Sequence, residues 1–252
     1  MRLLRARRGV WMAAMAVGLI LTAGCATGPH ANPKDPLEPM NRSISRFNDA
    51  LDDNVLKPVA TGYQNATPEL VQKGVRNVFN NLSDIWSTVN NALQLKGRDT
   101  AESLMRSVVN TVFGIYGIFD VATPIGLQRH PEDFGQTLGY WGVPDGPYLV
   151  LPIFGPSTVR DASMLPVELS LDPVGQHDVA AERNVAVFAR IVDKRAALLK
   201  TTNLLSDAAI DKYSFTRDGY LQFRRNQVYD GNPPDVDQLE DPSAEPVAPS
   251  AK

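Results

Sequence analysis

The side chains best suited to acid–base chemistry in this chain could form a Ser-His-Asp triad from Ser157 or Ser163, His130 and Asp161. In such a triad the histidine removes a proton from the serine hydroxyl while the carboxylate orients the imidazole ring. The G-x-S-x-G turn that exposes the serine in many hydrolases does not occur in the chain. Gly155-Pro156-Ser157 instead predicts an ordinary turn, because proline and serine favour turns. We therefore predict no catalytic residues.

A second candidate is His130-Pro131-Glu132-Asp133, whose residue types could form a metal-binding corner. The favoured interpretation is a helix N-terminus, with Pro131 at the first helical position and two acids in the first turn. The sequence contains no P-loop, dinucleotide fingerprint, EF-hand loop or zinc-ligand spacing. We predict no metal and no cofactor apart from a covalent lipid, for which the N-terminus gives the reason.

The N-terminus is typical of a secreted lipoprotein. Four arginines lie within the first eight residues, an apolar stretch follows from Val10 to Leu21, and Thr22-Ala23-Gly24 leads to Cys25. This pattern predicts a signal peptide over residues 1–24. The motif that ends at Cys25 resembles a bacterial lipobox, which predicts that Cys25 is acylated. The alternative is an ordinary signal peptide followed by an incidental cysteine. Similarity to Gram-negative lipoproteins and Ala26 after the cysteine together predict an outer-membrane address on the periplasmic side.

Composition excludes several classes of function. Without the signal peptide the chain has 21 basic and 28 acidic residues, a net charge of −7. A balance this acidic argues against nucleic-acid binding and against electrostatic adsorption to an anionic membrane. Attachment to a membrane would then depend on acyl chains and apolar surface. Cys25 is the only cysteine, so we expect no internal disulfide.

Apolar spacing predicts a mainly α fold with one domain. We assign residues 25–37 to a lipidated tether, 38–230 to the helical domain and 231–252 to a disordered acidic, proline-rich tail. Strand signals are poor, and most apolar stripes are expected to form the core. The expected helices cover Glu38–Lys57 ending at Pro58, the stretch from Pro68 to Leu93 with a break near Asn80–Ser83, Thr100–Phe113, Ala180–Thr202 and Asp207–Tyr229.

Two long apolar segments do not fit an ordinary helical core. Phe134–Val159 has Asp145 as its only charge but contains five glycines and four prolines, and Val108–Leu127 is similarly broken, with only Asp120 charged. Neither can form one uninterrupted helix. Each segment must be buried in the protein or must contact lipid. In contact with lipid, the backbone N–H and C=O groups at the helix breaks must form hydrogen bonds with protein. The aromatic residues of the first segment suit either a membrane interface or a core.

Several motifs resemble the MlaA (VacJ) lipoproteins over roughly residues 35–230. They are Asp35-Pro36-Leu37-Glu38, Asn41-Arg42, Phe47-Asn48, Lys57–Ala60, Asn110-Thr111, Phe119–Ala122, Phe134–Gly139, Gly142-Val143, Gly146-Pro147-Tyr148, Leu151-Pro152, Gly155 and Arg160-Asp161. The resemblance implies a ring-shaped helical lipoprotein in the inner leaflet of the outer membrane, with an amphipathic central channel. It also implies association with a trimeric porin. Stray outer-leaflet phospholipid would pass to a soluble periplasmic carrier, which maintains lipid asymmetry.

From the resemblance to this family we predict that Gly139–Gly155 is a mobile hairpin at the channel mouth. Its hinges would be Gly139, Gly142 and Gly146. Tyr140, Trp141 and Tyr148 would lie near lipid headgroups, and Phe154 belongs to the same lipid channel and hairpin. Arg160 and Asp161 either line the polar path or form a structural ion pair. Two other functions remain open: a lipid-anchored periplasmic lipid hydrolase and a structural envelope lipoprotein.

Overall fold

The computed structural model describes residues 32–234, without the side chains of 205–208. Cys25, the signal peptide and most of the expected tail lie outside the described residues. The elements are α2 (Glu38–Leu51), the π-helix η1 (Asp52–Leu56), α3 (Lys57–Ala66), α4 (Glu69–Leu93), α5 (Gly97–Val112), α6 (Phe134–Tyr140), β1 (Tyr148–Leu151), β2 (Gly155–Thr158), α7 (Val159–Leu171), α8 (Ala180–Ala208) and α9 (Lys212–Val228). The prediction of a mainly helical domain is confirmed.

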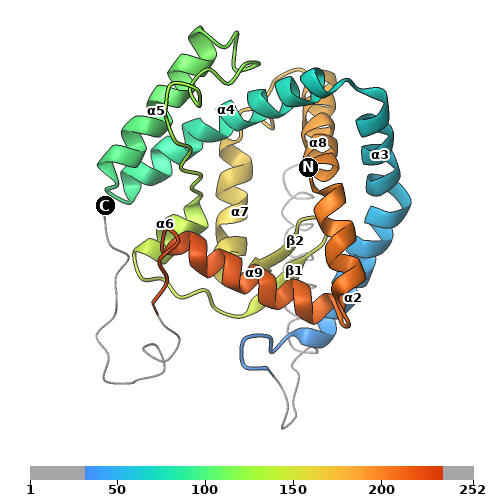
Figure 1. Ribbon diagram of the computed structural model, residues 1–252. Coiled ribbons are helices and arrows are strands. Elements are labelled where there is room, and N and C mark those ends of the chain that lie inside the picture. The colour runs from blue at the N-terminus through green and yellow to red at the C-terminus, as the bar shows by residue number, and fades with distance from the viewer. Residues whose placement is uncertain (1–31, 235–252) are drawn as a thin grey trace, which may run out of the picture.

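The helices are arranged in a ring (Figure 1). Helices α4, α3, α2 and α9 follow one another around the rim, and α5 packs along the outside of α4. Helix α8 packs on α3, where Ala196 and Leu199 meet Ala60 in a small apolar cluster. None of the described helices combines the length and the apolarity that a membrane crossing requires.

The chain passes Pro58 without leaving the helix, so the expected end there is wrong. Proline removes one i→i−4 hydrogen bond and crowds the preceding turn. Here the five-residue π-helix Asp52–Leu56 precedes it, and Pro58 lies in the first turn of α3. The wider π turn accommodates the missing bond.

Helix α4 is continuous from Glu69 to Leu93, so the expected break at Asn80–Ser83 is also wrong. Asn81 and Asp84, in and beside this stretch, are buried. Asn81 donates to the Thr111 hydroxyl at 2.9 Å, and Asp84 accepts from Arg129 Nε at 2.6 Å and Arg106 Nε at 3.3 Å. These residues stabilise the helix through tertiary hydrogen bonds instead of capping a new one.

Burial is inverted along much of the ring. Among the described residues, 22 polar or charged residues are buried and only 11 apolar ones are. The apolar stripe of α4, which includes Ile85, Val89 and Leu93, is exposed. Our expectation that most stripes form a core is therefore wrong for α4, and it fails again on α5, where Val108 and Val112 are exposed.

An antiparallel β-hairpin, missed by the sequence analysis, interrupts the helices. Tyr148 pairs with Thr158 and Leu151 with Gly155. The outer edge of β1 is satisfied by two α2 side chains: Asn41 bonds Tyr148 O at 3.0 Å and Val150 N at 2.9 Å, while Asn48 bonds Leu151 O at 2.9 Å and Ile153 N at 2.8 Å. Asparagines seven residues apart lie on one helical face, so α2 fixes the strand along its length.

The helix expected at Pro131 begins three residues later. Residues 128–133 are not helical, and α6 starts at Phe134. Asp133 is its N-cap and accepts from Gln136 N at 2.8 Å. An aspartate at this position satisfies an amide that the first turn leaves unpaired.

The two α2 asparagines should differ sharply in their contribution to stability. Asn41 is buried, and Asn41→Ala would leave the backbone groups of Tyr148 and Val150 unpaired away from water, so we expect a loss of about 2–4 kcal/mol. Asn48 is half-buried, so Asn48→Ala should cost only about 1 kcal/mol. Denaturant unfolding measures both values.

Hydrogen exchange should localise the effect of Asn48→Ala to residues 151–155, the tip that Asn48 holds. Asn54→Ala is the matched control, because Asn54 bonds only Ala50 O of its own helix turn. Faster exchange at the tip in the control, or equal unfolding energies for the Asn41 and Asn48 variants, would contradict this assignment.

Candidate functional site

A cavity of about 450 Å³ lies between α4, the start of α6, the hairpin tip, α7 and α8. It brings together segments that are more than 100 residues apart in the sequence. The lining residues are Leu82, Ser83, Trp86, Asn90, Glu132, Asp133, Phe134, Phe154, Leu165, Glu168, Leu169, Asp172, Pro173, Arg190, Ile191 and Lys194. Binding sites are commonly concave and apolar with a few placed polar groups, so this cavity is the candidate site.

The cavity has mixed walls. Trp86 of α4 and Phe134 of α6 form an aromatic wall, with ring centroids 6.4 Å apart. Phe154 at the hairpin tip lines the cavity and is 58% exposed. Carboxylates and cations from α7, α8 and the segment before α6 face the same space. Such a site can hold a molecule that has both an apolar and a charged part.

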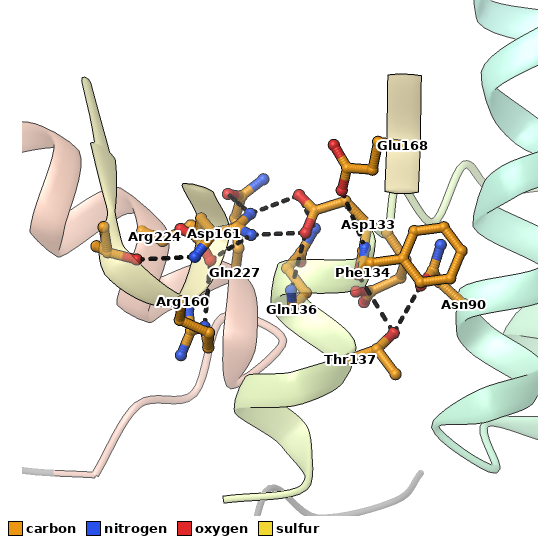
Figure 2. Close-up of polar contacts among 12 residues, drawn as sticks. Asn90, Asp133, Phe134, Gln136, Thr137, Arg160, Asp161, Glu168, Arg224 and Gln227 are labelled. Carbon is orange, nitrogen blue, oxygen red and sulfur yellow. Dashed lines mark hydrogen bonds and ion pairs between the residues drawn. The ribbon is translucent and has the colours of Figure 1, made fainter. Parts of the chain in front are cut away.

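A buried ion network fixes one side of the cavity (Figure 2). Arg224 of α9 donates to both carboxylate oxygens of Asp133 at 2.6 Å, and its Nε donates to Asp161 Oδ2 at 2.7 Å. Tyr220 also donates to Asp161 at 3.0 Å. Burial alone would raise the pKa of Asp133, but the bonds from Arg224 outweigh it and hold that pKa below its usual value. The network therefore stays charged and joins α6, α7 and α9.

Arg160 and Asp161 belong to this structural network, so the structure favours the ion-pair alternative for them. Arg160 Nε donates to Asp161 at 3.1 Å, and its guanidinium also pairs with Asp145 in the loop before β1. Gly139 lies against it: an added Cβ would meet Arg160 Nη1 at 2.7 Å and Val228 at 2.9 Å. Gly139 thus permits close packing, and its proposed role as a hinge stays a prediction.

The predicted aromatic contacts separate into two groups. Tyr148 is 1% exposed and packs with Val150 and Tyr213, so the expectation that it contacts lipid is wrong. Trp141 is 58% exposed, and its indole nitrogen donates to Leu93 O at 3.1 Å. Tyr140 lies 5.5 Å from the Lys96 ammonium, a cation–π distance. Buried and half-buried residues alternate along β1, which explains why Tyr148 is buried. The sequence analysis missed this burial because it did not recognise the strand.

Gly142 and Gly146 lie in the loop between α6 and β1. Both have positive φ, +85° and +67°, which L-residues rarely adopt. The two glycines therefore set the path of this loop, which brings Asp145 to Arg160. Their proposed role as hinges stays a prediction.

Glu168 of α7 is a site residue that the sequence analysis missed. It accepts a hydrogen bond from Phe134 N at 3.3 Å and lines the cavity (Figure 2). Burial, assisted by the negative charge of Asp133, raises the pKa of Glu168 to about 7. A single acid among Leu165, Val167 and Leu169 was the available signal in the sequence.

The side chains considered for a catalytic triad or a metal site each have other hydrogen-bond partners in the structure. His130 shares a hydrogen bond with Glu102 at 2.8 Å, while buried Ser157 donates to Thr158 O at 3.3 Å. Asp161 is engaged by Arg224, and Ser163 donates to Arg160 O. Within residues 32–234 we also find no cluster of three potential metal ligands.

Comparison with known proteins identifies relatives along most of the chain. The chain is 31% identical over 251 residues to the intermembrane phospholipid transport system lipoprotein MlaA of Escherichia coli, with 94% of each chain covered. It is 32% identical to the protein of the same name from Haemophilus influenzae, over 84% of this chain and 88% of that one. An uncharacterised Rickettsia typhi protein is 43% identical, but the chain spans only about half (51%) of its length.

A solved structure agrees with these sequence matches. It is described as the structural basis for maintenance of bacterial outer membrane lipid asymmetry, and it aligns with a TM-score of 0.67 at 31% identity. The alignment covers 77% of this chain and 98% of the solved one. The family model of the MlaA lipoprotein matches residues 33–227, which include the ring and every wall of the cavity. The chain belongs to the MlaA lipoprotein family.

Proposed function

We propose that this lipoprotein removes mislocalised phospholipid from the outer leaflet of the outer membrane and passes it to a soluble periplasmic carrier. It would be anchored by the covalent lipid on Cys25 at the periplasmic side of the outer membrane. The relatives named for phospholipid transport support this function. We propose no catalysis: the lipid would move with its ester bonds intact.

The outward-facing apolar surface is the observation that best supports this function. The segment after α5 exposes Phe113, Ile115, Tyr116 and Phe119. A surface of this kind on a single chain marks a contact with a membrane or with protein. A bilayer fits it well, because an acyl-anchored protein with a net charge of −7 must rely on apolar contact.

The backbone of this segment is also suited to lipid. Tyr116 N donates to Thr111 O at 3.0 Å, Gly117 N to Asn110 O at 2.8 Å, and Phe119 N to Gly114 O at 2.9 Å. The Asn110 side chain accepts from the amides of Val121 and Ala122. Irregular backbone in a bilayer is tolerated where protein satisfies its polar groups, and here the chain itself does so.

The cavity supports the passage of a lipid. Its aromatic and aliphatic walls match acyl chains, and its charged residues match a headgroup. We propose that Phe154, Trp141 and Tyr140 contact lipid along this path, with the hairpin tip as the mobile part. The tip contains Ile153 at φ +71°, a strained conformation for a β-branched residue, held by its bond to Asn48.

The partners follow from the family resemblance: a trimeric porin beside the ring, and a soluble periplasmic carrier that receives the lipid. The acidic charge balance supports the expectation that no nucleic acid is bound.

Deleting the gene tests the function directly. We expect phospholipid to accumulate at the cell surface, because stray molecules are no longer removed, and the wild-type gene should reverse this. Surface phospholipid is measured with an outer-leaflet phospholipase or an impermeant amine reagent. No rise after deletion would overturn the proposal, and release of free fatty acid by the purified protein would favour the hydrolase.

Cys25→Ala should remove the anchor. We expect the protein to lose radiolabelled palmitate and to leave the outer-membrane fraction, since stable anchoring takes more than one signal and the acyl chains are lost. Fractionation and labelling measure both effects. A palmitate-labelled Cys25→Ala protein would disprove the assignment of the lipidation site.

Phe154→Ala should slow lipid removal several-fold, because the cavity loses an aromatic wall at the hairpin tip. Phe188→Ala is the matched control: Phe188 on α8 is similarly exposed but does not line the cavity. Surface phospholipid after a pulse of labelled lipid reports the rate. Equal rates in the two variants would exclude Phe154 from the path.

A further inference from the structure

The charges that line the cavity are mostly neutralised by ion pairs. Glu132 pairs with Lys96 at 3.0 Å, and Asp172 pairs with Arg190 at 2.6 Å. Asp133 is held by Arg224, also at 2.6 Å. These three acids are therefore fully occupied, and their bonds stabilise the walls.

Two charged side chains remain for a ligand. Glu168 accepts only the backbone N–H of Phe134, and Lys194 has no ion-pair or hydrogen-bond partner among the described residues. They reach the cavity from different helices, Glu168 from α7 and Lys194 from α8. The cavity thus presents one unpaired acid and one unpaired base beside apolar walls.

We infer that this cavity binds the headgroup of a zwitterionic phospholipid that has a primary ammonium, of the phosphoethanolamine class. This inference rests on the proposed function and specifies the lipid. The Lys194 ammonium binds the phosphate, and the Glu168 carboxylate binds the lipid ammonium. The apolar walls formed by Trp86, Phe134 and Leu165 receive the start of the acyl chains.

The unpaired acid and the unpaired base together favour this headgroup over other phospholipid headgroups. A phosphoglycerol head is an anion with no ammonium, so it would satisfy Lys194 and leave Glu168 facing a negative charge. A phosphocholine head is also zwitterionic, but its quaternary ammonium has no N–H donors, so it would form no charge-assisted hydrogen bond with the carboxylate. In a partly buried cavity these differences are less screened than in water. We expect selectivity on the order of tenfold for each comparison.

The position of Glu168 supports this role. Phe134 N fixes one of its carboxylate oxygens, which leaves the other available, and Figure 2 shows the side chain beside Asp133 above the start of α6. A carboxyl group that is costly to bury as an anion gains most from a cationic ligand. The cost of burial is reflected in the pKa of Glu168, which is raised to about 7.

Binding should depend on pH. The charged groups that act on Glu168 are Asp133, Asp161 and Arg224, and the other charged groups that line the cavity are Glu132, Lys194 and the Asp172–Arg190 pair. Below pH 7 Glu168 is neutral and cannot balance an ammonium, so affinity for the phosphoethanolamine lipid should fall several-fold from pH 8 to pH 6. The phosphoglycerol lipid should show no such fall, and neither should the Glu168→Gln variant.

The test is a binding titration on the full-length lipidated protein in detergent. The probes are short-chain phospholipids of equal tail length with phosphoethanolamine, phosphoglycerol or phosphocholine heads, together with soluble phosphoethanolamine. We expect Glu168→Gln to remove most of the tenfold preference. Lys194→Gln should weaken all three lipids by a similar factor. Lys200→Gln is the control, because Lys200 is exposed on the same helix and does not line the cavity.

Each outcome decides between explanations. Equal affinity for the three lipids, unchanged by Glu168→Gln, would overturn the headgroup assignment while leaving lipid transport intact. If soluble phosphoethanolamine competes at the same concentration as the lipid, the acyl chains add nothing to affinity and the free headgroup alone is the ligand. That result would also overturn the assignment of a phospholipid to this cavity. No binding of any lipid by the wild-type protein would count against the proposed function itself. Circular dichroism of each variant confirms that the fold is retained.

Discussion

Buried polar side chains hold this ring together, because many of its apolar side chains are exposed and form no core. Asp84 is 1% exposed and is reached by arginines from two other segments, Arg106 of α5 and Arg129 of the extended stretch after it. A buried carboxylate is costly unless ion pairs and hydrogen bonds compensate it, and removal of one partner leaves an uncompensated charge. The network therefore allows few alternative arrangements. It replaces the apolar core as the source of a unique geometry.

The same kind of bonding positions the elements around the cavity. Arg224 joins the cap of α6 to the first turn of α7, and the two α2 asparagines hold the hairpin whose tip bears Phe154. Close approach makes these bonds possible, since a side chain at Gly139 would collide with Arg160. Gly139 thus contributes through the space it leaves, whereas Gly142 and Gly146 contribute through their positive φ. The proposed motion is confined to the tip, where Ile153 is strained and its partner Asn48 is accessible to water.

The inverted burial also links the fold to the proposed function. A ring that exposes apolar side chains can contact lipid tails, while its buried ion pairs keep charges away from the bilayer. The cavity combines apolar and charged walls, because Trp86 and Phe134 line it together with Glu168 and Lys194. A phospholipid has the same division between tail and head. The unpaired acid and base add a preference among headgroups that the overall shape could not supply.

The sequence by itself determined the helical class and the family, because these depend on local composition and on short motifs, and it predicts the lipoprotein signal on the same basis. Apolar spacing located most helices but could not tell which face of a helix is buried: Ile85 and Val89 recur at helical intervals whether they meet a core or a membrane. Only the tertiary structure decided that the polar face of α4 is the buried one. It also decided that Tyr148 is core and that Arg160 is structural, because their partners Tyr213 and Asp145 approach through folding. Glu168 and Lys194 become one site for the same reason, since long-range contacts cannot be read from local sequence.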